Sequence, residues 1–239
     1  MSTLTPMTLS SYEIAGTSPA LEMGEFRTPI DPAPAALSSA KRVMDAVGAF
    51  LGLVLLSIVL IVVAALVRLE SRGPVLFRQR RMGLGGRPFW CLKFRTMVPD
   101  AEQRLRDLEA CNEIPGGVLF KIKDDPRVTR LGRILRRTSL DELPQLWNVL
   151  MGQMSLVGPR PLQLRDSERL EAMDPESYAR RLSVVPGVTG PWQVSGRSGL
   201  DSQAMIRLDL DYVEQWTMAT DLRILGKTVA VVIAGRGAC

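Results

Sequence analysis

Two adjacent carboxylates, Asp141 and Glu142, are the residues of this 239-residue chain that could most readily carry out chemistry. The chain contains no histidine, so it lacks the commonest general base and cannot form a serine–histidine or cysteine–histidine nucleophile pair. Nucleophilic or base catalysis would therefore fall to carboxylates, other polar groups or a bound hard metal ion. Adjacent carboxylates shortly after Ser139 are equally typical of a capped helix start, and the pair alone leaves both interpretations open.

Basic residues accompany this pair. The chain has 30 lysines and arginines against 25 acidic residues, and 25 of the 30 are arginine, the side chain best suited to bidentate contacts with phosphate. This charge alone leaves nucleic acid, a membrane surface and a phosphorylated substrate open as partners. One arginine, Arg160, stands between Pro159 and Pro161, and the two prolines favour a stiff, extended backbone at this position.

A β-hairpin is expected to position part of this charge. It would run over residues 75–81, turn through the glycines of 83–86 and return over 89–97. Lys93 and Arg95 alternate with apolar residues in the second strand, so they are expected to share one face. One helix is predicted over residues 127–138 and a second over residues 139–151, with the two carboxylates in the first turn of the second helix.

One apolar segment, residues 46–67, contains no charged residue. As a helix of about 33 Å it could cross a hydrocarbon core of about 30 Å, and hydropathy alone is consistent with an ordinary crossing. Basic residues flank both ends, however, and the positive-inside rule then favours a helix that enters and leaves through one leaflet. The midpoint falls at Ser57, whose hydroxyl can bond to a backbone carbonyl and bend a helix.

The rest of the chain predicts one domain behind this anchor. Residues 1–40 are rich in serine, threonine, proline and alanine, and they are expected to be a disordered tail. The anchor would then span residues 41–72 and a cytoplasmic domain residues 73–239. The three cysteines, Cys91, Cys111 and Cys239, have neither disulfide nor metal spacing and are interpreted as reduced thiols of a cytosolic compartment.

Four segments together resemble one family. They are KFRTM (93–97), RRTSLDELPQLWNVLMGQMSLVGPRPL (136–162), PGVTGPWQVSGR (186–197) and LDLDYVEQW (208–216). They closely resemble the bacterial sugar transferases, the monotopic phosphoglycosyl transferases that start exopolysaccharide and glycoconjugate assembly. The resemblance covers about residues 40–237.

The resemblance implies both a fold and a reaction. The fold would be a small, mostly helical α/β domain with a short β-hairpin or sheet, one re-entrant membrane helix and interfacial amphipathic helices. It would lie on the cytoplasmic face of the bacterial inner membrane. The family moves a sugar 1-phosphate from a nucleoside diphosphate sugar, here expected to be a UDP-sugar, to undecaprenyl phosphate and releases the nucleoside monophosphate. Asp141, paired with Glu142, matches the family's nucleophile, which forms a covalent phosphosugar intermediate in the presence of Mg²⁺.

Attack by a carboxylate on a diphosphate brings like charges together, so cations or a metal are needed around it. Mg²⁺ typically takes one or two carboxylates together with substrate phosphates, and Asp141 and Glu142 are the candidate ligands. The residues that match basic family positions, and are expected to bind substrate phosphates, are Lys93, Arg95, Arg136, Arg160 and Arg197.

The chain departs from the family pattern at two positions. Ile58 stands where the family usually has proline, so the bend loses its strongest cause, and Gln153 stands where aspartate is common. The alternative from another class is a catalytically inactive, membrane-tethered scaffold of polysaccharide assembly, which the intact Asp141–Glu142 pair disfavours. Nucleic-acid binding is disfavoured by the apolar segment and by the few aromatic residues. The expected partners are therefore the nucleotide-sugar donor, undecaprenyl phosphate and the lipid bilayer, with other polysaccharide-assembly proteins left open.

Overall fold

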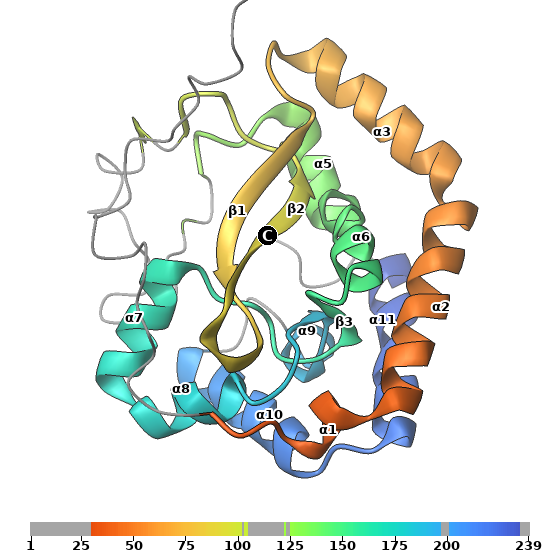
Figure 1. The fold of residues 1–239 in the computed structure, drawn as a ribbon. Helices are drawn as coiled ribbons and strands as arrows, with labels where there is room; N and C mark the ends of the chain where they lie inside the picture. The colour runs from red at the N-terminus through yellow and green to blue at the C-terminus, as the bar shows by residue number, and fades with distance from the viewer. Residues whose placement is uncertain (1–29, 102, 105–121, 123–124, 197–200, 235–239) are drawn as a thin grey trace, which may run out of the picture.

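The computed structural model describes residues 30–101, 103–104, 122, 125–196 and 201–234 of the chain. Within them the protein is mostly helical and carries two small two-stranded sheets, as the predicted fold class requires. A central β-hairpin separates α2 (Ser39–Leu55) and α3 (Ser57–Glu70) on one side from α7 (Leu164–Met173) and α8 (Pro175–Arg181) on the other (Figure 1).

The hairpin itself is confirmed. Strand β1 (Leu76–Met82) pairs antiparallel with β2 (Pro88–Phe94), and the turn η2 (Leu84–Gly86) reverses the chain between them. Gly85 and Gly86 take positive φ angles of 61° and 73° in this turn, a conformation that costs glycine little. The second strand ends three residues earlier than predicted, because Met97 pairs with Val128 in an isolated bridge instead of continuing the hairpin.

The apolar segment forms two helices rather than one. α2 and α3 are bent by 63° relative to each other, and the break falls at Leu56, directly before Ser57 (Figure 1). The predicted position of the bend is thus confirmed to within one residue. Among the described helices, neither half is long and apolar enough to cross a membrane by itself, whereas the bent pair together meets that requirement in length and composition.

The chain is folded before residue 40. A short helix, α1 (Pro34–Leu37), precedes α2, and the Ser38 hydroxyl caps α2 by accepting a hydrogen bond from the backbone N–H of Lys41. Ala35 is buried, and the N–H of Ala33 donates to the carbonyl of Ser183. The predicted end of the tail at residue 40 is therefore placed too late, because apolar burial and backbone pairing already order this segment. Residues 1–29 lie outside the described residues.

The second sheet is short and tightly packed. Strands β3 (Ser155–Val157) and β4 (Gly187–Thr189) pair in parallel. Glycines at 158, 187 and 190 bring the surrounding main chains so close that a Cβ on any of them would overlap neighbouring backbone atoms. The remaining elements are α5 (Arg130–Thr138), η4 (Leu140–Glu142), α6 (Gln145–Leu150), α9 (Pro191–Val194), α10 (Ser202–Glu214) and α11 (Met218–Ala234).

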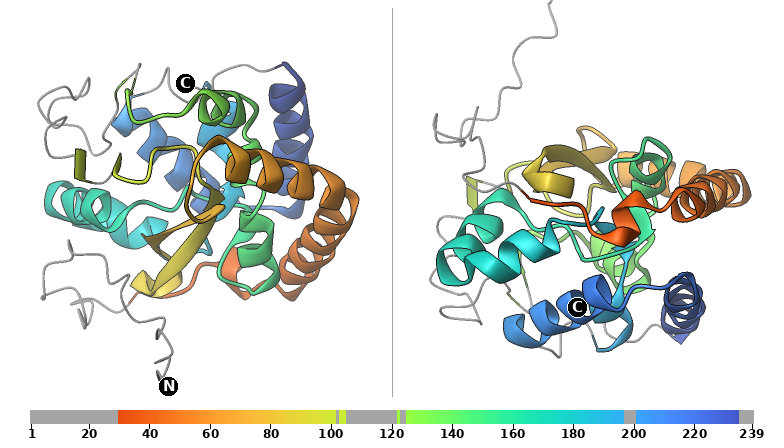
Figure 2. Two further views of the ribbon diagram at one scale, coloured as in Figure 1. Left: turned by 90° about the horizontal axis from the view of Figure 1, so that it is seen from above. Right: turned by 60° about the horizontal axis from the view of Figure 1, so that its bottom comes forward.

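Apolar packing joins both halves of the bent pair to the rest of the protein. Ala49 of α2 packs in one cluster with Phe89 and Cys91 of β2 and with α6, while Val63 and Val67 of α3 pack with the end of β2 and with α5. Figure 2 shows α2 and α11 at the same edge of the molecule, where an ion pair between Lys41 and Asp221 connects the beginnings of the two helices. The outer sides of α2 and α3 leave large apolar side chains exposed, namely Val43, Val47, Phe50, Leu51, Val54, Leu55, Ile58, Ile61, Val62, Leu66 and Leu69.

Candidate active site

Asp141 and Glu142 lie on η4, a single 3₁₀ turn between α5 and α6 that packs against β2. Ser139 takes a left-handed conformation (φ 57°) that ends α5 and redirects the chain. The prediction of one helix over residues 139–151 is therefore wrong at its start, since α6 begins only at Gln145. The tight turn brings the two carboxylates next to the hairpin instead of leaving them at an exposed helix end.

Glu142 is held by two cations from distant parts of the chain. Its Oε1 accepts a hydrogen bond from Lys93 Nζ at 2.7 Å and another from Arg160 Nη2 at 2.8 Å. Burial alone would raise the pKa of Glu142, but the positive charges of Arg160 and Lys93 outweigh it and hold that pKa well below its usual range. Glu142 is therefore a fixed anion across the physiological pH range.

Asp141 differs sharply from its neighbour. Its side chain is buried, with a relative exposure of 8%, yet within the described part of the chain neither carboxylate oxygen takes part in a hydrogen bond or ion pair. Burial raises the pKa of Asp141 to about 6, the repulsion of Glu142 adds to this rise, and the nearby Lys93 opposes it. A shielded carboxylate without committed partners keeps its lone pairs available for attack on an electrophile or for a metal ion.

The remaining predicted cations separate into three cases. Arg136 lies close enough to lower the pKa of Asp141, and its Nε donates to the Thr96 hydroxyl at 3.0 Å. Arg95 is directed elsewhere, because its Nη2 donates to the carbonyl of Ser71 at 2.7 Å, just beyond the end of α3. Arg197 lies outside the described residues. The structure thus brings together Lys93, Arg136 and Arg160 around the carboxylates, with Arg95 apart from them.

Sequence reasoning missed two residues beside Glu142. Arg81 and Gln145 line a pocket together with Cys91, Lys93, Glu142, Arg160 and Pro161. Arg81 is buried at the end of β1, and its Nη1 donates to the carbonyl of Pro161 at 2.6 Å. The alternation of β1 could have indicated it, because Phe77, which pairs with Lys93, and Arg81 lie on the same face of the hairpin.

Comparison with known proteins agrees with this arrangement. The family model described as bacterial sugar transferase matches residues 36–235, which is most of the chain and includes every described site residue above. The chain belongs to the bacterial sugar transferase family.

Named relatives of this sugar transferase extend the comparison. It is 45% identical over 194 residues to the UDP-glucose:undecaprenyl-phosphate glucose-1-phosphate transferase of Caulobacter vibrioides, covering 79% of this chain and 68% of the relative. It is 40% identical over 200 residues to the exopolysaccharide production protein ExoY of Sinorhizobium fredii, covering 82% of this chain and 87% of the relative. It is 44% identical over 200 residues to the galactosyl transferase CpsE of Streptococcus agalactiae, covering 83% of this chain and 43% of the relative. The chain thus spans less than half the length of some relatives that it matches.

The loop that carries Arg160 in this sugar transferase is fixed along its backbone. Successive carbonyls of Pro159, Arg160 and Pro161 accept hydrogen bonds from Gly187 N–H, Arg181 and Arg81 respectively. The Arg160 guanidinium also lies over the Trp192 ring, with its central carbon 5.7 Å from the ring centroid, a favourable cation–π distance. Rigid backbone and flanking contacts together aim this guanidinium at Glu142.

The residues around the carboxylates fit a substrate-bridged Mg²⁺ and not an all-protein metal cage. No group of three or more potential metal ligands of the histidine, cysteine, aspartate or glutamate type occurs within the residues that the structure describes. Where the structure describes the chain, the Asp141 carboxylate makes no hydrogen bond, and the contact of Glu142 Oε2 is a long one of 3.5 Å with Arg160. Mg²⁺ commonly uses one or two carboxylates and completes its coordination with phosphate oxygens and water.

Proposed function

We propose that this sugar transferase moves a sugar 1-phosphate from a UDP-sugar to undecaprenyl phosphate, as the first membrane step of exopolysaccharide or glycoconjugate assembly. The names of the relatives support the reaction class, since they include a glucose-1-phosphate transferase and an undecaprenyl-phosphate galactose phosphotransferase. The observation that carries the proposal for this chain is the contrast within its carboxylate pair. Glu142 is bound by two cations, whereas Asp141 is buried and uncommitted.

In the proposed first step, a carboxylate oxygen of Asp141 attacks the phosphorus atom that bears the sugar. A bond forms between that oxygen and phosphorus, the phosphoanhydride bond breaks, and its electron pair leaves with the nucleoside monophosphate. In the second step a phosphate oxygen of undecaprenyl phosphate attacks the same phosphorus and releases the Asp141 carboxylate. Both steps begin with anionic reactants, so the charges around Asp141 decide whether they can proceed.

We propose that the cations of the site supply the positive charge that both steps require. Lys93 and Arg160 neutralise Glu142 in the described structure, and an incoming diphosphate would share the same donors. Arg136, whose pKa is lowered by burial, faces Asp141 from α5 and would contact the donor phosphates. Asp141 and Glu142 are the residues that would hold Mg²⁺, and the ion would supply further positive charge to stabilise the negative charge that develops on the leaving phosphate.

We also propose that α2 and α3 form a re-entrant anchor in the cytoplasmic leaflet. Both ends of the pair are tied to the same domain: Lys41 Nζ lies 2.6 Å from Asp221 Oδ2, and Ser71, which follows α3, accepts a hydrogen bond from Arg95. A straight crossing would pull one of these ends to the other side of the bilayer. The exposed apolar side chains between the two ends would then insert into lipid.

Intact-mass analysis tests the covalent step. Wild-type protein mixed with UDP-sugar and Mg²⁺, in the absence of undecaprenyl phosphate, should gain the mass of a phosphosugar and release UMP, and Asp141→Asn should gain nothing. Arg87→Gln, which changes a residue in the hairpin turn, is the matched control and should form the adduct. An adduct on the asparagine variant would assign the nucleophile elsewhere. Absence of both adduct and UMP release across a panel of UDP-sugars would favour the inactive scaffold.

A further inference from the structure

A buried ion pair behind the candidate active site contacts neither carboxylate of η4. Arg181 is the last residue of α8 and Asp209 lies within α10; their side chains are 4% and 0% exposed. Arg181 donates from Nε and Nη2 to Asp209 Oδ2, at 3.1 and 2.7 Å. Such a pair is costly to bury, and apolar residues of similar volume often stabilise a fold as well or better. Its presence therefore calls for a role besides stability.

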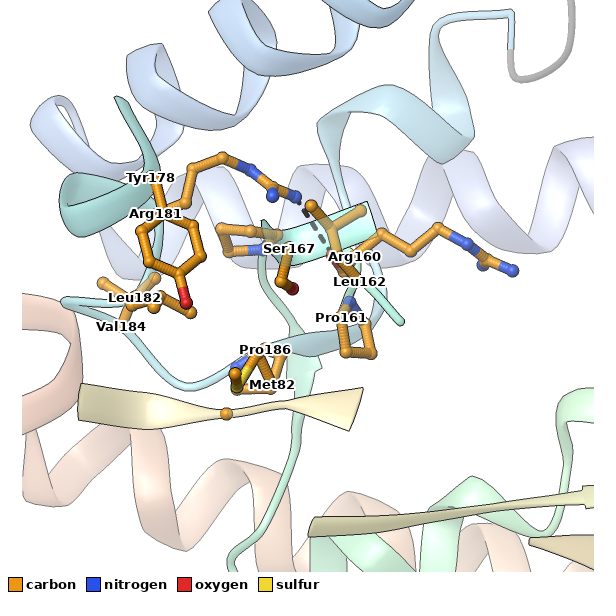
Figure 3. Close-up of a pocket in the computed structure, with 12 residues that line it drawn as sticks. Met82, Arg160, Pro161, Leu162, Ser167, Tyr178, Arg181, Leu182, Val184 and Pro186 are labelled. Carbon is orange, nitrogen blue, oxygen red and sulfur yellow. Dashed lines mark hydrogen bonds between the residues drawn. The ribbon is translucent and has the colours of Figure 1, made fainter. Parts of the chain in front are cut away.

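The additional role is indicated by a third hydrogen bond of Arg181. Nη2 also donates to the backbone carbonyl of Arg160 at 3.0 Å, so one nitrogen joins Asp209 to the loop that carries Arg160. Figure 3 shows this bond and shows the Arg160 side chain extending away from Arg181. At its far end that side chain contacts Glu142.

We propose that Arg181, held by Asp209, is a positioning residue that fixes the backbone of Arg160 and thereby sets its guanidinium against Glu142 and the donor phosphates. The inference rests on the proposed transfer reaction, but it concerns residues that touch neither substrate nor reacting atoms. The prolines on both sides stiffen Arg160, yet they do not stop the loop from moving as a unit. Buried donors on the loop carbonyls restrain it, and Arg181 supplies the donor at Arg160 itself. A displacement of about 1 Å at a phosphate-binding group can cost about 100-fold in rate.

The electrostatics of the pair suit this role. Asp209 Oδ1 has no hydrogen-bond partner among the described residues. Arg181 is the main group that compensates the buried charge of Asp209, and the positive charge of Arg160 contributes less. The pairing fixes the plane of the guanidinium and leaves its second Nη2 hydrogen for the Arg160 carbonyl. Arg81 donates to the next carbonyl of the loop, that of Pro161, and to the Gln79 side chain, and within the described residues it forms no ion pair with a carboxylate.

A double-mutant cycle tests the proposal. The double variant Arg181→Met/Asp209→Leu removes the ion pair without leaving an uncompensated charge, and we expect its kcat for sugar-phosphate transfer to fall about 10- to 100-fold. In a protein that also carries Arg160→Ala, the same two changes should lower kcat by less than about threefold, because Arg181 acts through Arg160. Equal losses in both backgrounds would refute the proposal, since they would show a role in general stability.

A spectroscopic measurement makes the test independent of turnover. The nitrogen-15 resonance of Arg160 Nε, assigned by its disappearance in Arg160→Ala, should report a rigid side chain in wild type and a flexible one in the double variant. An unchanged resonance would overturn the inference even if activity fell. If wild type transfers no sugar phosphate from any donor, the proposed function fails, and the resonance still decides whether Arg181 positions Arg160.

Two further variants address the cases in which the double variant does not fold or in which the loss is not specific to Arg181. Arg181→Lys keeps a positive charge beside Asp209 but lacks the planar fork that reaches both acceptors, so it should reproduce the loss if the double variant does not fold. Arg180→Met removes the neighbouring arginine of α8, which pairs with Glu214 near the surface. This control should leave kcat and the Arg160 resonance unchanged. A loss of equal size in Arg180→Met would refute a specific role for Arg181.

Discussion

Replacing Asp141 by asparagine should stabilise the fold at neutral pH, although it removes the proposed nucleophile. Asparagine has nearly the same shape but no charge to bury. Burial raises the pKa of Asp141 from an ordinary value of 3.8 to about 6. At about 1.4 kcal/mol per pH unit, this difference corresponds to at most about 3 kcal/mol of unfolding free energy, and we expect a gain of about 1–3 kcal/mol.

The sign follows from proton binding. Folded Asp141 binds its proton more tightly than the unfolded chain does, so the associated stability is fully present below about pH 4 and is lost as pH rises through about 6. The asparagine variant has no such titration at this position. Its advantage over wild type should therefore be small near pH 4, grow between pH 4 and 6, and reach its full value above pH 7.

Urea unfolding in detergent micelles, followed by tryptophan fluorescence, would measure this difference. Chelator keeps divalent ions away from Asp141, and other buried carboxyls such as Asp209 are common to both proteins and cancel in the comparison. Asp100→Asn is the control, because the Asp100 side chain is 43% exposed and pairs, among the described residues, with the exposed Arg104; it should change stability by less than about 0.5 kcal/mol. A variant no more stable than wild type at pH 7.5, or one with a constant difference at all pH values, would refute the reasoning.

Three other outcomes are expected. Gly187→Ala should lower the free energy of unfolding, measured by urea titration, by more than about 2 kcal/mol, because the new Cβ would overlap the backbone of Gly158. Gly226→Ala is the control: its Cβ meets open space, so the same titration should show little effect or a slight stabilisation. Removal of divalent ions with EDTA should stop UMP release and Mg²⁺ should restore it without zinc, whereas full activity in excess chelator would mean that the protein cations suffice. In a protein with Cys91, Cys111 and Cys239 replaced, Ser38→Cys should resist an impermeant thiol reagent applied from the periplasm; labelling from that side would mean an ordinary crossing.

The sequence predicted the elements that carry the site better than the contacts between them. Alternation in the second strand placed Lys93 and Arg95 on one face, but β2 ends at Phe94, so the alternation no longer constrains Arg95. Its side chain joins the end of α3, while Lys93 reaches Glu142. Local patterns locate a strand well, but the residue at which pairing stops depends on a distant partner, here the Met97–Val128 bridge.

The buried ion pair of Arg181 and Asp209 could not be predicted from the sequence, because it too depends on a contact between distant segments. Arg181 and Asp209 are ordinary members of polar helix faces in the sequence, and only packing of α8 against α10 buries them together. By contrast, the stiff backbone at Arg160 could be predicted from the prolines on either side of it. Features encoded within a few residues could be predicted, whereas contacts between distant helices could not.

The ion pair between Lys41 and Asp221 can form only late in the synthesis of the described residues, after both partners have been made. The partners are 180 residues apart in the chain, so at about 5–20 residues per second a ribosome needs roughly 10–40 s to make the second after the first. During that interval the residues of α2 and α3 have been synthesised, whereas Asp221, the partner of Lys41, has not. In the proposed topology, the growing chain therefore selects its side of the membrane with a free cation. The folded protein then retains that choice through a buried ion pair that can form only after Asp221 has been synthesised.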